Sequence, residues 1–174
     1  NYMSSFHHQM KNSELNSPYL AEIATKHPYS LLSEDEFNKL FENCKYVKFK
    51  PGQILLRPDE LPQRLLFVLS GQVRLIGKHP LTKEPFTLQL KGPGQLLGWA
   101  SLLRGEACEW VIASEETLAI SFSAQNFISS IKSSSNFQEV FAELSNIQES
   151  FFVASRSAED AHNVKEDWFD QILD

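Results

Sequence analysis

Two glycines, Gly94 and Gly98, stand four residues apart and are followed by a short apolar stretch from Trp99 to Leu103. Glycine readily takes the positive φ angles of tight turns, and it lets the backbone approach another group closely. A helix that begins at Trp99 presents unpaired backbone N–H groups at its first turn, and such groups bind anions. The pattern therefore predicts a phosphate-type anion site where this helix begins.

An anion site of this kind needs a scaffold, and the segment from Lys45 to Ser123 is typical of a β domain. Its apolar runs alternate with turn residues such as Ser70-Gly71, where Gly71 is expected to supply the positive φ of a hairpin. The expected strands cover residues 46–49, 53–57, 65–69, 72–76, 86–90, 109–113 and 117–122. Short strands at intervals of about 8–12 residues predict a sandwich or a barrel.

Helices are predicted on the N-terminal side of the strands. Ser17 and Pro18 suit the cap and the first turn of one helix, and His27-Pro28 ends it. A second helix begins with a capping box formed by Ser33 and Glu36. Each helix has an apolar face for burial, with Leu20, Ile23 and Ala24 in the first and Phe37, Leu40 and Phe41 in the second.

Two further helices are predicted after the strands. Ser123 is expected to cap the first, and Asn136 the second, after a break at residues 133–135. Apolar residues recur at helical spacing in the second helix: Phe137, Val140, Phe141, Leu144, Ile147 and Phe151. Such a face must pack on something. It is expected to cover the domain's own barrel, or to meet the same helix of a second copy in a homodimer through Phe137–Phe151.

The charge of the chain argues against a nucleic-acid partner. The formal net charge is −6 and the pI is near 5.4, whereas surfaces that bind nucleic acids are basic. Acids crowd the C-terminus: Glu159, Asp160, Glu166, Asp167, Asp170 and Asp174. We expect residues 1–28 to be a helical or flexible leader with His7 and His8 unstructured, 29–153 to be the domain, and 154–174 to be an acidic tail or linker.

The remaining composition favours a cytoplasmic chain. Cys44 and Cys108 have neither metal nor redox spacing and suggest a reducing compartment. Residues 2–11 lack the basic start and the apolar run of a signal peptide. No stretch approaches the run of about 18 apolar residues that a spanning helix requires. We therefore expect no membrane insertion by this chain itself.

Three segments, in this order, resemble the cyclic-nucleotide-binding domain family, which includes the catabolite activator sensor domain and the regulatory subunits of cyclic-nucleotide-dependent kinases. They are residues 50–55 (KPGQIL), 66–75 (LFVLSGQVRL) and 94–98 (GQLLG). The resemblance implies a mainly β fold with flanking helices. The fold would be a double-stranded β-helix, or jelly-roll, barrel of about eight strands with N-terminal helices and two C-terminal helices. It also implies that residues 94–103 begin a phosphate-binding cassette.

The cassette departs from the family pattern where a nucleotide would bind. In the family an acid after the second glycine accepts the ribose hydroxyl, and an arginine roughly nine residues on neutralises the phosphate. The acid's position holds Trp99, whose indole can only donate. The arginine's position falls on Ala107 or Cys108, and the neighbouring serine or threonine becomes Glu109 or Trp110. Since a buried phosphate without its cation typically costs several kcal/mol, cyclic-nucleotide binding in the usual way is not expected.

The pocket positions that the resemblance implies are Leu97, Gly98, Trp99, Ala100, Ser101, Arg104, Cys108, Glu109 and Trp110. Arg104, at the end of the cassette helix, or Arg74, on a strand, could supply a substitute cation, although a surface arginine is the ordinary interpretation. Trp99 and Trp110 either form a stacking wall for another flat ligand or fill the cavity of the missing nucleotide. His79 alone does not make a haem site, so no cofactor is expected.

The function predicted from these residues is regulatory. No catalytic set or metal cluster emerges, and Glu106 and Glu109 should raise the pKa of the Cys108 thiol. We expect a non-enzymatic signalling or interaction module of a larger protein, and the resemblance extends to bacterial export ABC transporters. The alternative is a genuine sensor of a cyclic nucleotide or another small ligand, in a transcription regulator whose DNA-binding domain is absent from this chain.

Overall fold

The computed structural model describes residues 7–9 and 18–160, with side-chain surroundings for residues 18–147. Its strands are β1 (His7–Gln9), β2 (Lys45–Phe49), β3 (Ile54–Leu56), β4 (Arg64–Ser70), β5 (Val73–Lys78), β6 (Pro85–Lys91), β7 (Leu96–Leu97), β8 (Val111–Ala113) and β9 (Thr117–Ser123). They form two antiparallel sheets, in the orders β1-β2-β9-β4-β7 and β3-β8-β5-β6. The predicted mainly β jelly-roll architecture is confirmed.

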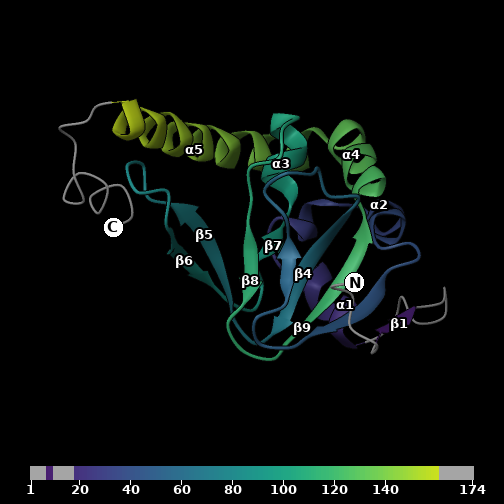
Figure 1. Ribbon diagram of the computed structural model, residues 1–174. Coiled ribbons are helices and arrows are strands. Elements are labelled where there is room, and N and C mark those ends of the chain that lie inside the picture. Colours follow the sequence, from purple (N-terminus) through teal and green to yellow (C-terminus); the bar gives the residue numbers. More distant parts are fainter. Residues whose placement is uncertain (1–6, 10–17, 161–174) are drawn as a thin grey trace.

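Helices flank the two sheets. On the N-terminal side lie α1 (Pro18–Ala24), the short 3₁₀ helix η2 (Tyr29–Leu31) and α2 (Glu34–Leu40); α3 (Trp99–Arg104), α4 (Ala124–Ser133) and α5 (Ser135–Asp160) follow later in the chain. Figure 1 shows α5 running from α4 across α3, with its far end on the β5–β6 side of the view. Contacts of α4 with α2, and of α5 with α3 and α4, join the helices into one layer.

Strand β4 has two buried faces because it separates two apolar cores. Leu66 and Val68 point into the barrel and pack with the aliphatic residues of the second sheet. Leu65 and Phe67 point the other way, into a cluster shared with the helices. A strand buried on both faces is expected to be a continuous apolar run rather than an alternating one, which is the pattern of residues 65–69.

The core beneath the helices is aromatic. The Phe141 ring of α5 has its centroid 5.0 Å from the Phe137 centroid and 5.1 Å from the Phe127 centroid, and the Trp99 centroid of α3 lies 5.4 Å away. All four side chains are at most 8% exposed. Aromatic pairs with centroids at about 4.5–7 Å gain stability beyond their buried area. The start of α5 is therefore fixed to the barrel through α3 and α4.

The predicted caps have mixed outcomes. The Ser33–Glu36 capping box of α2 is confirmed, and so is Ser123, whose Oγ accepts from Gln125 N at 3.0 Å. The Asn136 cap is wrong. The Oγ of Ser134 accepts from Phe137 N at 3.3 Å instead, because α4 continues to Ser133 and α5 begins at once. Ser17 lies outside the described residues.

The two ends of the domain differ from the expectation in detail. His7–Gln9, expected to be unstructured, forms β1 on the free edge of β2, with His7 opposite Val47. An edge strand can pair through main-chain hydrogen bonds without a particular side-chain pattern. The sequence of residues 7–9 therefore did not indicate this strand. At the other end α5 continues to Asp160, inside the segment predicted as a tail.

The apolar face of α5 is divided between two environments. Phe137 and Phe141 are buried in the domain's own core, whereas Leu144 is 40% exposed and Ile147 is 63% exposed. The expectation that this helix packs on its own domain therefore holds for its first turns. The Phe151 side chain lies outside the described side chains.

Candidate functional site

The turn into α3 depends on Gly98, which is the N-cap residue of the helix. Its φ is +101°, in the left-handed region that favours glycine. A Cβ at this position would lie 2.8 Å from a Leu65 methyl carbon and 3.4 Å from Pro62 Cγ. Gly98 has no side chain with which to cap the helix, so the first N–H groups of α3 need an acceptor from elsewhere.

Glu109 provides that acceptor. Its Oε2 accepts from Gly98 N at 3.2 Å, and its Oε1 accepts from both Ser101 N and Ser101 Oγ at 3.0 Å. The residue is only 6% exposed. A carboxylate is stabilised at a helix N-terminus by the dipole and by charge-assisted hydrogen bonds. The backbone donors expected at the start of α3 are therefore present, and a carboxylate of the chain itself accepts from them.

An external anion would meet an unfavourable environment at this position. Gly98 N and Ser101 N already donate to Glu109, so a phosphate would have to displace a buried carboxylate or approach it closely. Two like charges at short distance in a low-dielectric site repel strongly. The geometry therefore favours internal closure of the cassette over phosphate binding.

Ser101 connects the carboxylate to Cys108. Cys108 N donates to Ser101 Oγ at 3.2 Å, and Cys108 Sγ lies 3.4 Å from the same oxygen. Burial is the main reason that the pKa of the Cys108 thiol is raised, and the charges of Glu109 and Glu106 raise it further. The predicted direction is confirmed, although the sequence suggested the acids rather than burial as the cause. A thiol with a raised pKa is a poor nucleophile at neutral pH.

Lys91 is a neighbour of this group that the sequence analysis missed. It lies opposite Val73 in the β5–β6 pairing, and Val73 belongs to the barrel core, so Lys91 faces the barrel interior. Burial lowers the pKa of its ammonium group, and the charge of Glu109 opposes that shift. The inside of the cassette thus holds a cation and an anion supplied by the chain.

The other pocket positions lie on different sides of the cassette. Leu97 points into the barrel core, whereas Trp99 and Ala100 belong to the aromatic core under the helices. Trp110 is half-buried before β8, and it makes no ring contact with Trp99 among the described side chains. Trp99 thus packs between α3 and α5 against the Phe141 ring.

The alternative cations and the histidine have local partners. Arg104 is 12% exposed, and its Nε lies 3.4 Å from Glu106 Oε2. Arg74 Nη1 lies 3.5 Å from Thr87 Oγ1 on the neighbouring strand. His79 Nδ1 accepts from Leu81 N at 3.2 Å and from Thr82 N at 3.3 Å, so it orders the β5–β6 turn. Residues 18–147 contain no group of side chains arranged to hold a metal ion.

Sequence reasoning identified Glu109 as a pocket residue but gave it the role of repelling phosphate. The sequence signal for this residue was a single acid that stands between Cys108 and the apolar segment Trp110–Ala113. Its acceptor role could not be inferred from spacing, because the carboxylate reaches backbone groups eight and eleven residues earlier in the chain.

The comparison with family models assigns the fold. The model of the cyclic nucleotide-binding domain matches residues 46–134, more than half of the chain of 174 residues. The chain belongs to this family. No curated protein sequence matches it.

Solved structures agree with that assignment. The catabolite activator protein of Thermus thermophilus is 28% identical, with a TM-score of 0.56 over 68% of this chain and 57% of that one. The regulatory subunit of a cAMP-independent protein kinase A from Trypanosoma brucei is 18% identical, with a TM-score of 0.67 over 78% and 48%. The sensor domain of the transcriptional regulator DNR from Pseudomonas aeruginosa is 14% identical, with a TM-score of 0.64 over 76% and 90%.

The chain thus spans about half the length of the first two of these proteins. Among the helices that the structure describes, none has the length and apolar character needed to cross a membrane.

Proposed function

We propose that this domain is a regulatory or interaction module of a larger protein and does not bind cyclic nucleotides in the family's usual way. The observation that carries the proposal is the hydrogen bonding of Glu109 to Gly98 N, Ser101 N and Ser101 Oγ. The donors that a phosphate would use serve an internal carboxylate instead. Cys108, at or next to the position of the family's arginine, supplies no positive charge to compete for an anion.

The relatives are compatible with this proposal. One of the matched structures is described as the regulatory subunit of a cAMP-independent protein kinase A. A domain of this fold can therefore regulate a partner without depending on cAMP. The proposed activity is a docking surface that is present without a nucleotide, rather than one that a nucleotide switches on.

Helix α5 is the proposed docking element. Its first turns are fixed to the barrel by Phe137 and Phe141, while Leu144 and Ile147 remain exposed further along. An exposed apolar strip on a helix is typical of a protein interface. The proposed occupant is another domain of the same protein or the same helix of a second copy. In sedimentation velocity experiments Ile147→Glu should dissociate a homodimer that forms through α5.

The test of the nucleotide proposal is a calorimetric titration with cAMP and cGMP, with thermal unfolding measured in parallel. The wild-type chain should release no binding heat and show no stabilisation up to millimolar nucleotide. A double variant, Cys108→Arg with Glu109→Ser, should gain measurable affinity because it adds a cation and frees the α3 amides. Micromolar binding by the wild-type chain would refute the proposal.

A second candidate function is that of a ligand sensor in a transcription regulator. The 28% identity to the catabolite activator protein favours it. It predicts saturable nucleotide binding by the wild-type chain, so the same titration separates the two candidates. The bacterial export ABC transporter as parent protein, and the cytoplasmic location, stay predictions from the sequence.

A further inference from the structure

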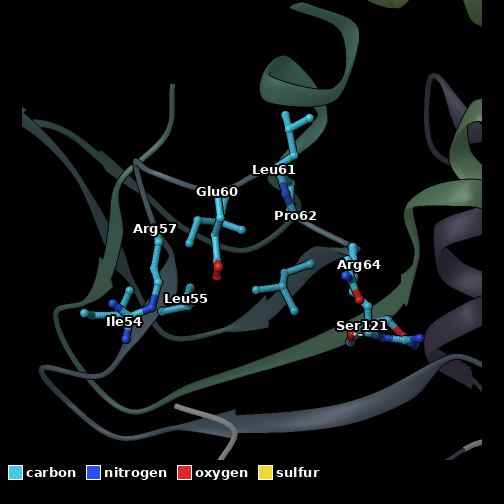
Figure 2. A pocket seen from close by; sticks show the side chains of 11 residues that line it. Ile54, Leu55, Arg57, Glu60, Leu61, Pro62, Arg64 and Ser121 are labelled. Atoms are coloured by element: carbon cyan, nitrogen blue, oxygen red, sulfur yellow. Dashed lines mark hydrogen bonds between the residues drawn. The ribbon is translucent and has the colours of Figure 1, made fainter. Parts of the chain in front are cut away.

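A pocket of about 400 Å³ opens where the chain crosses from one sheet to the other. Its floor consists of Leu55, Leu56 and Leu66, which are at most 7% exposed and belong to the barrel core. The connection between β3 and β4, residues 57–63, forms its rim (Figure 2). The volume lies in the range of small-molecule sites, about 300–1,000 Å³. The lining residues do not include Glu109 or its hydrogen-bond donors.

Two opposite charges lie at the rim of this pocket. Arg57 follows β3, and Glu60 points its carboxylate into the pocket beside it (Figure 2). Both residues are exposed, and neither forms a salt bridge with any side chain in residues 18–147. An acid and a base that face the same pocket without pairing can each bind a group of opposite charge.

The opposite wall of the pocket is held rigidly. Arg64 Nε donates to Ser121 Oγ at 2.6 Å, and Arg64 Nη2 donates to Ser121 O at 2.8 Å. These bonds join β4 to β9 across the far side of the pocket. A site with one fixed wall and an apolar floor is preorganised for a small ligand.

We propose that this pocket binds a free α-amino acid with an apolar side chain. The α-carboxylate pairs with Arg57, the α-ammonium pairs with Glu60, and the side chain packs on Leu66 and the rest of the apolar floor. A phosphate or another dianion fits less well, because Glu60 would repel it. A purely apolar ligand would leave both charges without a role.

The rim also connects the pocket to the helices. Gln63 O accepts from Ala124 N, the first residue of α4, at 2.9 Å. Pro62 packs beside Gly98, where the cassette helix begins. A ligand held by Arg57 and Glu60 therefore lies next to the segment that fixes α4, so binding should also be visible at Ala124.

The experiment is a titration of the full 174-residue chain, labelled with ¹⁵N, with L-leucine and L-phenylalanine. We expect saturable shifts of the Gln63, Leu66 and Ala124 amide signals. Isoamylamine and 4-methylpentanoate, which carry only one of the two charges, should bind at least about tenfold more weakly, because each loses one charge-assisted contact. Arg57→Gln and Glu60→Gln should each weaken L-leucine binding by a similar factor.

Lys132→Gln and Glu139→Gln are the matched controls, since both remove an exposed charge outside the pocket and should leave binding unchanged. The proposal is overturned if neither amino acid produces saturable shifts at millimolar concentration. It is also overturned if the rim variants bind as the wild-type chain does, or if the singly charged analogues bind equally well. Binding of cyclic nucleotide at Gly98 and Ser101 would affect the proposed function but not this result.

Discussion

Helices α2 and α3 both begin with hydrogen bonds to a glutamate, but the two glutamates differ in position and surroundings. At α2, Glu36 Oε1 accepts from Ser33 N at 2.9 Å, and Ser33 Oγ accepts from Glu36 N at 3.2 Å, all within four residues at the surface. At α3 the acceptor is Glu109, which comes from the segment before β8 and is buried.

The two caps differ in how they form and in which backbone donors they use. The α2 capping box is complete within four residues, and Glu36 Oε2 additionally accepts from Ser133 Oγ of α4 at 3.4 Å. The α3 cap requires the chain to fold first, and it uses the donors that an external anion would otherwise bind. The same chemistry therefore stabilises the start of both helices, and at α3 it pairs the backbone donors of the cassette with a buried carboxylate.

The substitution with the largest expected effect on stability tests whether α3 depends on its packing against α5. Phe141→Ala should lower the free energy of unfolding by about 3–5 kcal/mol, because it removes a buried aromatic side chain that contacts Trp99. Urea unfolding followed by circular dichroism measures the change. Ile147→Ala, on the exposed part of the same helix, should change stability by no more than about 0.5 kcal/mol. Equal effects of the two variants would contradict the assigned packing.

The next effect concerns the buried cap itself. Glu109→Ala should destabilise the domain by about 1–3 kcal/mol, since it leaves buried N–H donors without their acceptor. Glu109→Gln keeps one acceptor oxygen and should cost less. The midpoint of urea unfolding should therefore be highest for the wild-type chain, lower for Glu109→Gln and lowest for Glu109→Ala. A stability gain in Glu109→Ala would show that the carboxylate is strained rather than stabilising at the start of α3.

A smaller effect should appear in the chemistry of Cys108. Because burial and the charges of Glu109 and Glu106 raise the pKa of this thiol, iodoacetamide should modify it slowly at pH 8. Glu106→Gln should lower the thiol pKa and speed the modification by less than about tenfold, the factor that corresponds to one pKa unit. Cys108→Ser identifies the signal by mass spectrometry. A slower reaction in Glu106→Gln would contradict the assigned charge effect.

The smallest effect concerns the exposed cap. Hydrogen bonds from Ser33 hold the pKa of Glu36 below its ordinary value of 4.5. The stability that the ionised Glu36 carboxylate adds to the fold is therefore present above its ordinary pKa of 4.5. This stability is lost as the pH falls through the lower pKa of the folded state. Glu36→Gln should cost less than about 1 kcal/mol at pH 7, and the difference from wild type should shrink on acidification. A difference that grows toward low pH would contradict the cap.

The comparison of α2 and α3 also separates what the sequence could predict from what it could not. The Ser33–Glu36 box was predictable because both partners lie within one turn. The strand spacing predicted a sandwich or a barrel, and the resemblance to the family implied the jelly roll. The position of the free backbone donors followed from Gly98 and the helix behind it. Their acceptor did not, because the approach of Glu109 depends on the fold of the intervening residues.

The sequence also could not predict toward which side of a helix or strand a given side chain would point. Trp99 was expected either to form a stacking wall or to fill the nucleotide cavity, and the sequence did not indicate its contact with Phe141 of α5. Lys91 went unnoticed because its orientation depends on the register of β6 against β5. The prediction of Asn136 as the cap missed Ser134, because serine and asparagine have similar cap propensities and only the exact end of α4 decides between neighbouring residues.

The most direct test of internal closure is the hydrogen exchange of two amides, Gly98 N–H and Ser101 N–H, measured by NMR in three proteins. In Glu109→Ala both amide signals should shift, and both should exchange faster than in the wild-type chain. In Glu36→Ala, the control at the exposed cap, only the Ser33 amide should respond. Unchanged Gly98 and Ser101 amides in Glu109→Ala would show that the carboxylate does not occupy the cassette, and the central claim would fail.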